Sequence, residues 1–409
     1  MSNEKILVVC QHFWPESFRL NDIASFLVEK GHQVEVLCGL PNYPKGEFAP
    51  GYSARGPYRE KYNGVDVRRT FEIPRRGNTS LRIFLNYISF PLFSLVHVPR
   101  MLMSRYDKIF LYQLSPVMMS LAGIIVGKVR RVETTMYVLD LWPENLYSVL
   151  NVRNRMLRSL LEKVSHWHYR NVDKIVVLSD LMKDRLAGVS GLSPEKITVI
   201  PQACEKIYET RVEDSSLVSR FDRGFNVVFA GNISPAQSFD TIVEAAASIR
   251  DSGISDINWI IVGDGMSRAD VEEKVRVSGL ADNFYFEGQH PVEDIPRYTA
   301  VADALVGCLV SSDLLEATIP AKVLSYIASG KPLVLAMDGE VEKLVVEEAR
   351  CGLVGPTEDA AALADNVVKL YRMSQEERLE MGESGRRYHF AHLERNIVLE
   401  KLRKFILAN

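Results

Sequence analysis

The chain has 409 residues, which is long for one hydrophobic core and suits two domains. Hydrophobic residues make up 47% of it and charged residues 25%, the composition of a folded globular protein rather than a disordered one. The net charge of −3 conceals an asymmetry. Residues 1–200 carry 27 Lys and Arg against 18 Asp and Glu, a charge of +9, and the remainder carries 22 against 34, a charge of −12. The basic half predicts anionic partners such as lipid headgroups or pyrophosphates, and without a nucleic-acid-binding motif no nucleic-acid partner is expected.

Cysteine usage favours a reducing compartment. The five cysteines are odd in number and show no paired metal-binding spacing: Cys10, Cys38, Cys204, Cys308 and Cys351. We therefore expect buried, reduced thiols in a cytoplasmic protein, not a disulfide framework. The first residues enter a strand at once, and no secretory signal is expected.

The first predicted elements form a βαβ unit. Residues 5–10 are an apolar strand, residues 11–16 a loop, and a helix follows through Leu27 before the strand 34–38. The unit lacks the Gly-x-Gly-x-x-Gly fingerprint, so no dinucleotide is expected. Residues 39–62 are rich in Gly, Pro and Tyr and too long for a simple connector. They are interpreted as a substrate-facing lid, with a disordered surface loop as the alternative.

Residues 83–99 form an apolar segment without a charge. Pro91 is expected to interrupt it, and a membrane-spanning helix needs about 20 apolar residues, so spanning is not predicted. Five arginines flank it: Arg75, Arg76, Arg82, Arg100 and Arg105. The pattern indicates an interfacial segment on an anionic membrane leaflet, or alternatively a buried crossover helix.

Strands are predicted next at 109–112, 134–139 and 174–178. The sequence Asp-Leu-Trp-Pro-Glu at 140–144 follows the second of these directly. Ligands in open α/β sheets bind beyond the carboxyl ends of strands, so its two carboxylates are candidates for chemistry. A cap on the following turn is the alternative for Asp140.

The βα rhythm restarts after a passage at 201–222. Strands at 226–230, 259–262 and 284–288 each lead into a glycine turn, and 304–310 leads into the stretch 311–334. There Pro320 suits the first position of a helix, and Gly330 suits its left-handed end. Lys322 puts a cation in the first helical turn, where the helix dipole disfavours it, which suggests a bound diphosphate. Glu316 would hold a sugar hydroxyl, and an ordinary βαβ crossover is the alternative.

Several motifs then occur in a recognisable order. They are Gly-His-x-Val-x-Val at 31–36, Phe-Ala-Gly-Asn at 229–232, Ile-Val-Gly-Asp-Gly at 261–265, Phe-x-Gly at 286–288 and the stretch 311–334. The set resembles glycosyltransferase family four. The resemblance implies a retaining, metal-independent transferase without a cofactor, built as two Rossmann-like α/β domains facing a cleft (the GT-B fold). Its domains would be 1–205 for acceptor and membrane, 206–388 for the nucleotide-sugar, and a helix at 389–409 packing back on the first.

Finer details resemble one subgroup. Pro-Glu-x-x-Arg at 15–19, Asp-Leu-Trp-Pro-Glu at 140–144 and Thr-Ile-Pro-x-Lys at 318–322 are similar to N-acetyl-L-fucosaminyltransferases of bacterial O-antigen and capsule assembly. The resemblance implies a UDP-linked donor, a polyprenyl-diphosphate-linked sugar acceptor and peripheral attachment to the inner membrane. A nucleotide-sugar 2-epimerase of the same fold and a non-catalytic partner subunit are the alternatives.

The resemblance also assigns roles to residues. Asp140, Glu316 and Lys322 are the predicted catalytic residues. Donor binding is assigned to Gly231, Asn232, Gln237, Gly263, Gly288, Gln289, Thr318, Ile319, Pro320 and Ser325. Contacts with the acceptor or the cleft are assigned to Glu16, Arg19, Tyr43, Trp142 and Glu144, and no metal site is predicted.

Three positions depart from the family pattern. Asn232 and Gln237 stand where the family usually has Arg and Lys, which places more weight on Lys322 for holding phosphate. Ser325 stands where a Glu usually holds the nucleotide ribose. From the sequence alone, Ser325→Glu is therefore expected to tighten nucleotide binding, because a carboxylate accepts hydrogen bonds from both ribose hydroxyls.

Overall fold

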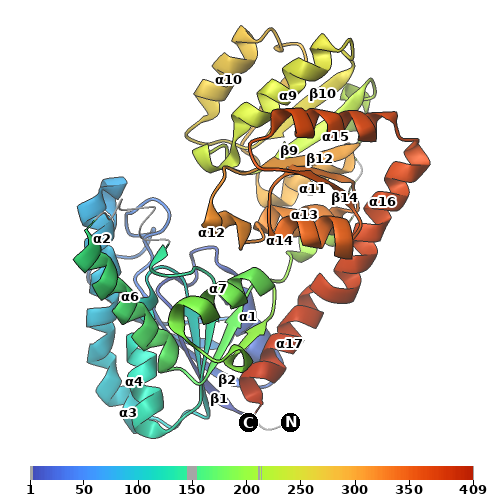
Figure 1. Cartoon of the computed structure of the whole chain (residues 1–409). Coiled ribbons are helices and arrows are strands. Elements are labelled where there is room, and N and C mark those ends of the chain that lie inside the picture. Colours follow the sequence, from blue (N-terminus) through green and yellow to red (C-terminus); the bar gives the residue numbers. More distant parts are fainter. Residues whose placement is uncertain (1–2, 145–153, 211, 213, 409) are drawn as a thin grey trace. The chain divides into compact units, whose positions relative to one another are not determined.

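The structure is a computed structural model that describes residues 3–144, 154–210, 212 and 214–408. The whole motif 140–144 is therefore described, and Glu144 is the last described residue before residues 145–153. The chain forms two α/β units, one made of residues 1–201 and 399–409 and the other of residues 202–398 (Figure 1). The second part of the last helix, α17 (Arg395–Leu407), therefore packs on the first unit, as predicted. Lys108 and Lys174 of the first unit both donate hydrogen bonds to the carbonyl oxygen of Ala408.

The first unit is built on an eight-stranded sheet with the order β3-β4-β2-β1-β5-β6-β7-β8. Its strands are β1 (Lys5–Val9), β2 (Gln33–Gly39), β3 (Arg59–Tyr62), β4 (Val65–Thr70), β5 (Lys108–Gln113), β6 (Thr134–Val138), β7 (Lys174–Val177) and β8 (Ile197–Val199). Every pairing is parallel except that of β3 with β4. The helices described in this unit, besides the end of α17, are α1 (Arg19–Glu29), α2 (Ser80–Ser94), α3 (Val98–Met103), α4 (Leu121–Arg130), α6 (Arg155–Arg170) and α7 (Asp180–Ser190).

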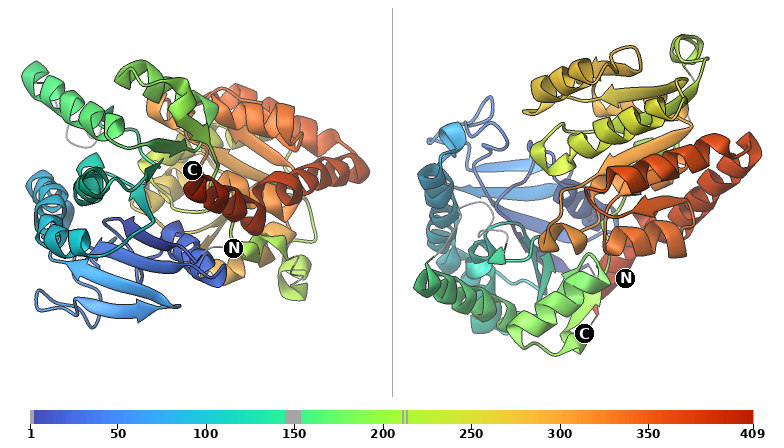
Figure 2. Two further views of the ribbon diagram at one scale, coloured as in Figure 1. Left: turned by 90° about the horizontal axis from the view of Figure 1, so that it is seen from below. Right: turned by 45° about the horizontal axis from the view of Figure 1, so that its top comes forward.

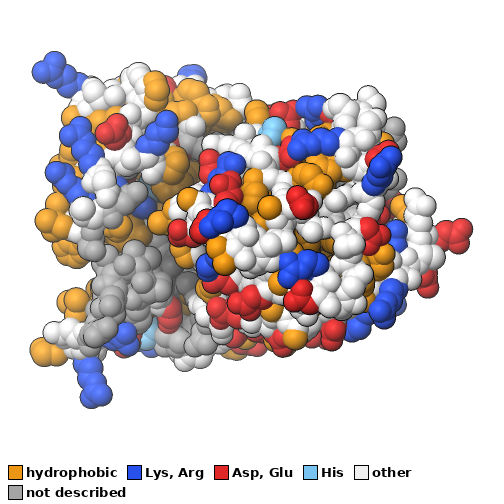
Figure 3. Space-filling view, turned by 90° about the horizontal axis from the view of Figure 1, so that it is seen from above, with side chains coloured by type: hydrophobic (Ala, Val, Ile, Leu, Met, Phe, Trp, Pro, Cys, Tyr) orange, Lys and Arg blue, Asp and Glu red, His pale blue; other side chains and the backbone are white. Residues whose placement is uncertain are grey.

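Two sequence predictions for this unit need correction. The segment 39–62 is not loop throughout, because its last four residues form β3, which pairs with β4 as a hairpin at the sheet edge. Pro91 does not interrupt the apolar helix either. It lies inside α2, which continues through a short 3-10 turn at Leu95–His97 into α3. Figure 3 shows hydrophobic side chains interspersed with Lys and Arg at its left edge, which belongs to this unit.

The second unit is built on a six-stranded, fully parallel sheet with the order β11-β10-β9-β12-β13-β14. Its strands are β9 (Phe225–Ala230), β10 (Ile257–Val262), β11 (Phe284–Gly288), β12 (Ala304–Cys308), β13 (Leu333–Ala336) and β14 (Gly352–Gly355). The described helices are α8 (Ser215–Arg220), α9 (Phe239–Asp251), α10 (Arg268–Val277), α11 (Ile295–Ala300), α12 (Asp313–Glu316), α13 (Ala321–Ser329), α14 (Glu340–Glu342), α15 (Ala360–Arg372) and α16 (Gln375–Tyr388).

Both faces of this second sheet are buried. Along β9, Val227 and Phe229 belong to one apolar core, whereas Val228 and Ala230 belong to the core on the opposite face. This alternation arises because successive strand residues point to opposite faces, and helices cover both faces of a parallel sheet (Figure 2). With both faces covered by helices, ligands can bind beyond the carboxyl ends of the strands. The structure thus has two Rossmann-like units, as expected.

Candidate functional site

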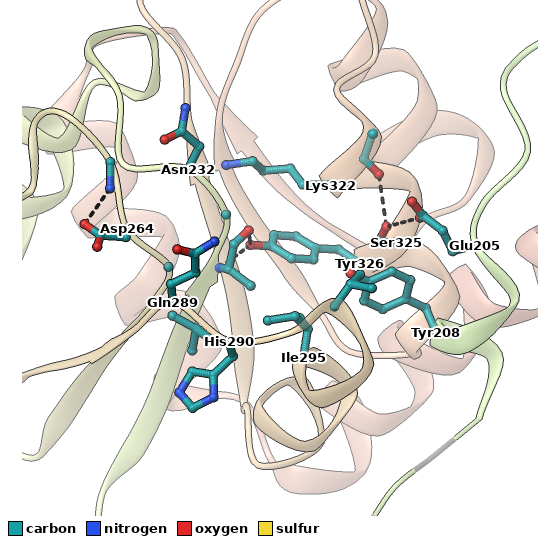
Figure 4. A pocket seen from close by; sticks show the side chains of 17 residues that line it. Glu205, Tyr208, Asn232, Asp264, Gln289, His290, Ile295, Lys322, Ser325 and Tyr326 are labelled. Atoms are coloured by element: carbon teal, nitrogen blue, oxygen red, sulfur yellow. Dashed lines mark hydrogen bonds between the residues drawn. The ribbon is translucent and has the colours of Figure 1, made fainter. Parts of the chain in front are cut away.

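A cavity of 730 Å³ lies in the second unit beyond the carboxyl ends of β9, β10 and β11 (Figure 4). Six predicted donor-site or catalytic residues line it: Gly231, Asn232, Gly263, Gln289, Lys322 and Ser325. The remainder of its wall consists of Glu205, Tyr208, Ala230, Val262, Asp264, Gly265, His290, Val292, Ile295, Ala321 and Tyr326. The cavity therefore combines a cation, carboxylates, amides and an apolar portion.

Glycines allow two strand ends to approach closely beneath the cavity. Gly263 has a φ of +142°, and a Cβ atom there would overlap the carbonyl oxygen of Gly231. A Cβ on Gly231 would lie 3.1 Å from the Nζ of Lys322. Only glycine tolerates this backbone conformation and so close an approach of neighbouring atoms. The two glycine turns therefore add no side chains to the floor of the cavity.

Helix α13 carries the polar groups of the opposite wall. Pro320 is its N-cap and Ala321 its first residue, so the proline stands one position earlier than predicted. Tyr326 fixes the helix to the sheet, because its hydroxyl accepts a hydrogen bond from the backbone N–H of Ala230 at 2.8 Å. Lys322 and Ser325 are three residues apart and share the helix face that borders the cavity.

Lys322 is the cation of this wall. Its Nζ lies 4.0 Å from the centroid of the Phe229 ring and donates a hydrogen bond to the side-chain oxygen of Gln237. Burial lowers the pKa of Lys322 to about 7, because desolvation disfavours its charged form. An anionic ligand would restore the charge, so the amine is poised to bind one with uptake of a proton at alkaline pH.

Glu205 was not predicted from the sequence. It precedes a short 3-10 turn at Lys206–Glu209, and its Oε2 lies 3.5 Å from the hydroxyl oxygen of Ser325. The Ser325 hydroxyl also donates a hydrogen bond to the carbonyl oxygen of Ala321 at 3.2 Å. A carboxylate thus stands beside the position at which the family pattern has a Glu. It is supplied by a segment 120 residues away in the sequence.

The other donor-binding residues predicted in this unit, and the predicted catalytic residue Glu316, do not line the cavity. These are Gln237, Gly288, Glu316, Thr318, Ile319 and Pro320. Gln237 reaches it through Lys322, and the carbonyl oxygen of Gly288 accepts a hydrogen bond from the N–H of Gly263 at 2.8 Å. Glu316 is the last residue of α12, and the short loop 317–320 separates it from α13. Their roles in binding or catalysis stay predictions.

The predicted catalytic residue Asp140 and the predicted acceptor residues lie at the carboxyl edge of the first sheet. Asp140 follows β6, and its Oδ2 accepts a hydrogen bond from the hydroxyl of Ser115 at 3.1 Å. Tyr43 is exposed, and the guanidinium carbon of Arg75 lies 5.8 Å from its ring centroid. Arg19 is the first residue of α1. Burial raises the pKa of the Tyr112 phenol, and the positive charge of Arg19 partly offsets that rise.

Glu16 and Trp142 are buried in the first unit. Glu16 is 5% exposed, and its Oε1 accepts hydrogen bonds from the backbone N–H groups of Asn42 at 2.8 Å and Tyr43 at 2.6 Å. Its Oε2 lies 3.0 Å from the Nδ1 of His12. Glu16 therefore holds the Tyr43 loop in place. Trp142 is fully covered, and its backbone N–H donates a hydrogen bond to the hydroxyl of Tyr169.

Beside Glu16 lies the buried carboxyl group of Glu72. Burial raises the pKa of Glu72 well above its usual value, and the nearby charge of Glu16 adds to the rise. The Oε1 of Glu72 accepts a hydrogen bond from the side-chain amide of Asn42, and its Oε2 has no partner among the described residues. A protonated carboxyl group suits this environment. Within the described residues no group of His, Cys, Asp or Glu side chains has the arrangement of a metal site.

Comparison with known proteins agrees with this division. Residues 17–203 match the family model "Glycosyl transferase 4-like domain", and residues 224–373 match "Glycosyl transferases group 1". A 2-deoxystreptamine glucosyltransferase of Streptomyces kanamyceticus is 28% identical over 218 residues, which cover 49% of this chain and 56% of that protein. The match therefore spans only about half of that relative. A putative colanic acid biosynthesis glycosyl transferase of Escherichia coli K12, WcaI, is 22% identical over 83% of this chain and 84% of its own.

Solved structures resemble the whole chain in fold. HepE of Anabaena in complex with UDP superposes with a TM-score of 0.73 at 15% identity, over 99% of this chain and 100% of that one. WaaG, a glycosyltransferase involved in lipopolysaccharide biosynthesis, gives a TM-score of 0.67 at 14% identity, with the same coverage.

Proposed function

Since the chain belongs to the family-four glycosyltransferases, we propose that the cavity of its second unit binds a UDP-linked sugar, which the protein transfers to a saccharide acceptor. The observation that carries the proposal is the order of groups along α13. Lys322 supplies a cation, and one helical turn later Ser325 and Glu205 supply a hydroxyl and a carboxylate. One turn of helix rises about 5.4 Å, which suits the separation between a diphosphate and the ribose that carries it.

Each part of a nucleoside diphosphate has a matching group. A carboxylate accepts hydrogen bonds from two neighbouring hydroxyls, so Glu205 is suited to the ribose diol. Val292, together with Tyr208 and Ile295 (Figure 4), gives the wall an apolar portion for the base. Lys322 lies where a diphosphate would meet it, and the UDP complex of the structurally similar HepE supports the choice of nucleotide.

The reaction breaks the bond between the sugar's anomeric carbon and the diphosphate. Negative charge then grows on the departing phosphate, and preorganised donors directed at that charge provide a large part of catalysis. Protonated Lys322 is the group of the described cavity suited to this task. Retention of anomeric configuration is proposed from the family resemblance, in which the acceptor attacks from the side of the leaving group.

The finer assignment is also a proposal. We infer a polyprenyl-diphosphate-linked acceptor, an N-acetylfucosamine-type donor sugar and a cytoplasmic protein attached peripherally to the inner membrane. The motif similarities at 15–19, 140–144 and 318–322 support the subgroup. The name of the E. coli relative, which refers to colanic acid biosynthesis, supports a role in surface polysaccharide synthesis.

A nucleotide panel tests the proposal. UDP, GDP, ADP, CMP and dTDP are titrated into the protein by calorimetry with a metal chelator present. UDP is expected to bind most tightly, and Lys322→Ala is expected to weaken it. UDP-sugars are then incubated with and without a lipid-linked acceptor. Transfer only with acceptor supports the proposal, donor turnover without acceptor indicates an epimerase or hydrolase, and absence of both with intact UDP binding indicates a non-catalytic subunit.

A further inference from the structure

The first unit exposes an apolar stripe along the whole of α2 and α3. The helical stretch Leu81–Met103 has the length and composition of a membrane-crossing helix, and its most apolar 18 residues have a mean hydropathy of 1.4 and are 33% buried in the unit. Its solvent-facing positions recur at helical spacing: Leu81, Phe84, Leu92, Val96 and Met103 are exposed. At 1.5 Å per residue the stripe is about 34 Å long. Monomeric proteins rarely expose so long a continuous apolar surface.

The opposite face of α2 is part of the fold. Asn86, Ser89 and Phe90 are buried, and Asn86 accepts a hydrogen bond from Gln11 at 2.9 Å and donates one to the carbonyl oxygen of Ile73 at 2.8 Å. These polar contacts anchor the helix to the first unit. Moving it into the bilayer core would break them, so the helix is suited to lie on a membrane rather than to cross it.

A second amphipathic helix exposes a similar stripe. Along α6, Leu157, Leu160 and Trp167 lie at helical spacing and are exposed, while Ser165, His168 and Tyr169 are buried against the unit. Both α6 and α2 contact the 3-10 turn Val117–Ser120, and Figures 1 and 2 show them on the same side of the first unit.

The charges beside both stripes have one sign. Residues 73–106 contain five arginines and no Asp or Glu. Arg76, Arg82 and Arg105 are exposed. Helix α6 carries three arginines and a lysine against a single glutamate. Basic side chains beside an apolar stripe attract anionic headgroups while the apolar side chains enter the acyl boundary. A second copy of this face would bring like charges together, so self-association is disfavoured.

We propose that α2–α3 and α6 together form a docking surface for an anionic lipid bilayer, with the apolar stripes at the depth of the headgroups. The apolar side chains provide the contact, and the arginines select anionic lipid. This inference rests on the peripheral membrane attachment proposed above and names the surface that makes it, and its test is separate from that of the donor site because it needs no nucleotide.

Vesicle flotation of the full chain tests the proposal. Phosphatidylcholine vesicles with and without phosphatidylglycerol are compared at low and high salt. Leu92→Glu and Leu160→Glu remove one exposed side chain from each stripe, and Leu379→Glu on α16 is the matched control. Leu160 is 58% and Leu379 50% exposed, so neither change is expected to disturb folding, which thermal unfolding checks.

Binding is expected only with phosphatidylglycerol and to weaken in high salt. Each stripe variant should reduce the partition coefficient at least fivefold, whereas the control should leave it unchanged. Equal partitioning of Leu160→Glu and Leu379→Glu would show that α6 is not part of the docking surface. Binding that does not depend on lipid charge would contradict the selection of anionic lipid by the arginines. A concentration-dependent dimer that Leu160→Glu dissolves, without vesicle binding, would instead identify a second copy as the occupant and contradict the proposal.

Tryptophan quenching provides an independent readout. Trp167 is 44% exposed, whereas Trp142 and Trp259 are 2% exposed and Trp14 is half-buried and stacked on Tyr62. Lipids brominated near the headgroup should quench the fluorescence of the bound protein, and Trp167→Phe should abolish most of that quenching without preventing flotation. Undiminished quenching in Trp167→Phe would mean that α6 does not touch the bilayer.

Discussion

Moving a carboxyl group between positions 205 and 325 probes the proposed ribose subsite. Three variants are needed: Glu205→Gln, Ser325→Glu and the exchange Glu205→Ser with Ser325→Glu. Because the Oε2 of Glu205 lies 3.5 Å from the hydroxyl of Ser325, either position can present a carboxylate to the same corner of the cavity.

The single variants have calculable effects on UDP affinity. Hydrogen bonds to a charged group contribute about 1.5–3 kcal/mol, so Glu205→Gln should weaken UDP binding roughly 10- to 150-fold. Ser325→Glu would place two carboxylates about 4 Å apart, where they repel by about 4 kcal/mol at an effective dielectric constant of 20. Solvent in the open cavity reduces this, and we expect roughly tenfold weaker binding. The sequence alone predicts that Ser325→Glu tightens UDP binding. The structure reverses this prediction because the carboxylate of Glu205 already occupies that corner of the cavity.

The exchange variant separates charge from position. It restores one carboxylate without repulsion, so UDP affinity should return to within about threefold of the wild type, a difference below 1 kcal/mol. Calorimetry measures all four proteins, and thermal unfolding checks that each is folded. Wild-type affinity in Glu205→Gln, or an exchange variant no better than Ser325→Glu, would refute the ribose role of Glu205.

Three further predictions concern buried groups. UDP affinity should fall as pH rises above about 7, because free Lys322 loses its proton there, and Lys322→Met should bind UDP weakly at every pH; calorimetry that finds the same pH slope in both proteins would assign the slope elsewhere. Since the folded pKa of Glu72 is raised, the folded state keeps a proton that the unfolded state loses above its ordinary pKa of about 4.5, so stability should decline as pH rises from there, and Glu72→Gln should flatten that decline in urea unfolding. A slope unchanged in Glu72→Gln would show that Glu72 is ionised in the fold. Tyr326→Phe leaves the buried N–H of Ala230 without its partner, and should cost about 1–3 kcal/mol of unfolding free energy; no loss in denaturant titration would contradict the anchoring role.

Most of the parallel strands were predictable from the sequence because they are short apolar runs followed by a glycine or polar turn, whereas β4 and β14 were not predicted. Residues 225–230 and 257–262 are buried on both faces, so their hydrophobicity is nearly continuous. Strand β3 was missed because its residues, Arg-Glu-Lys-Tyr, are polar and sit on the sheet edge, where no apolar alternation is required. Burial of the helix face around Asn86 and Ser89 explains how α2 continues through Pro91.

The candidate donor site was predictable only in part. Lys322 was found because a cation at the start of a helix opposes the dipole, which is a local signal. Glu205 gave no such signal, since it lies in the passage between the two domains and meets Ser325 only through the fold. The departure at Ser325 was the sole indication that a carboxylate from elsewhere was needed, and only the fold brings Glu205 to that position.

The structure of the protein with UDP bound, determined by crystallography in the presence of chelator, is the most direct test of the proposed donor site. We expect the diphosphate within hydrogen-bonding distance of the Nζ of Lys322, and both ribose hydroxyls hydrogen-bonded to the carboxylate of Glu205, in the cavity beside α13. UDP bound away from α13, or bound there only through a divalent metal ion, would contradict it.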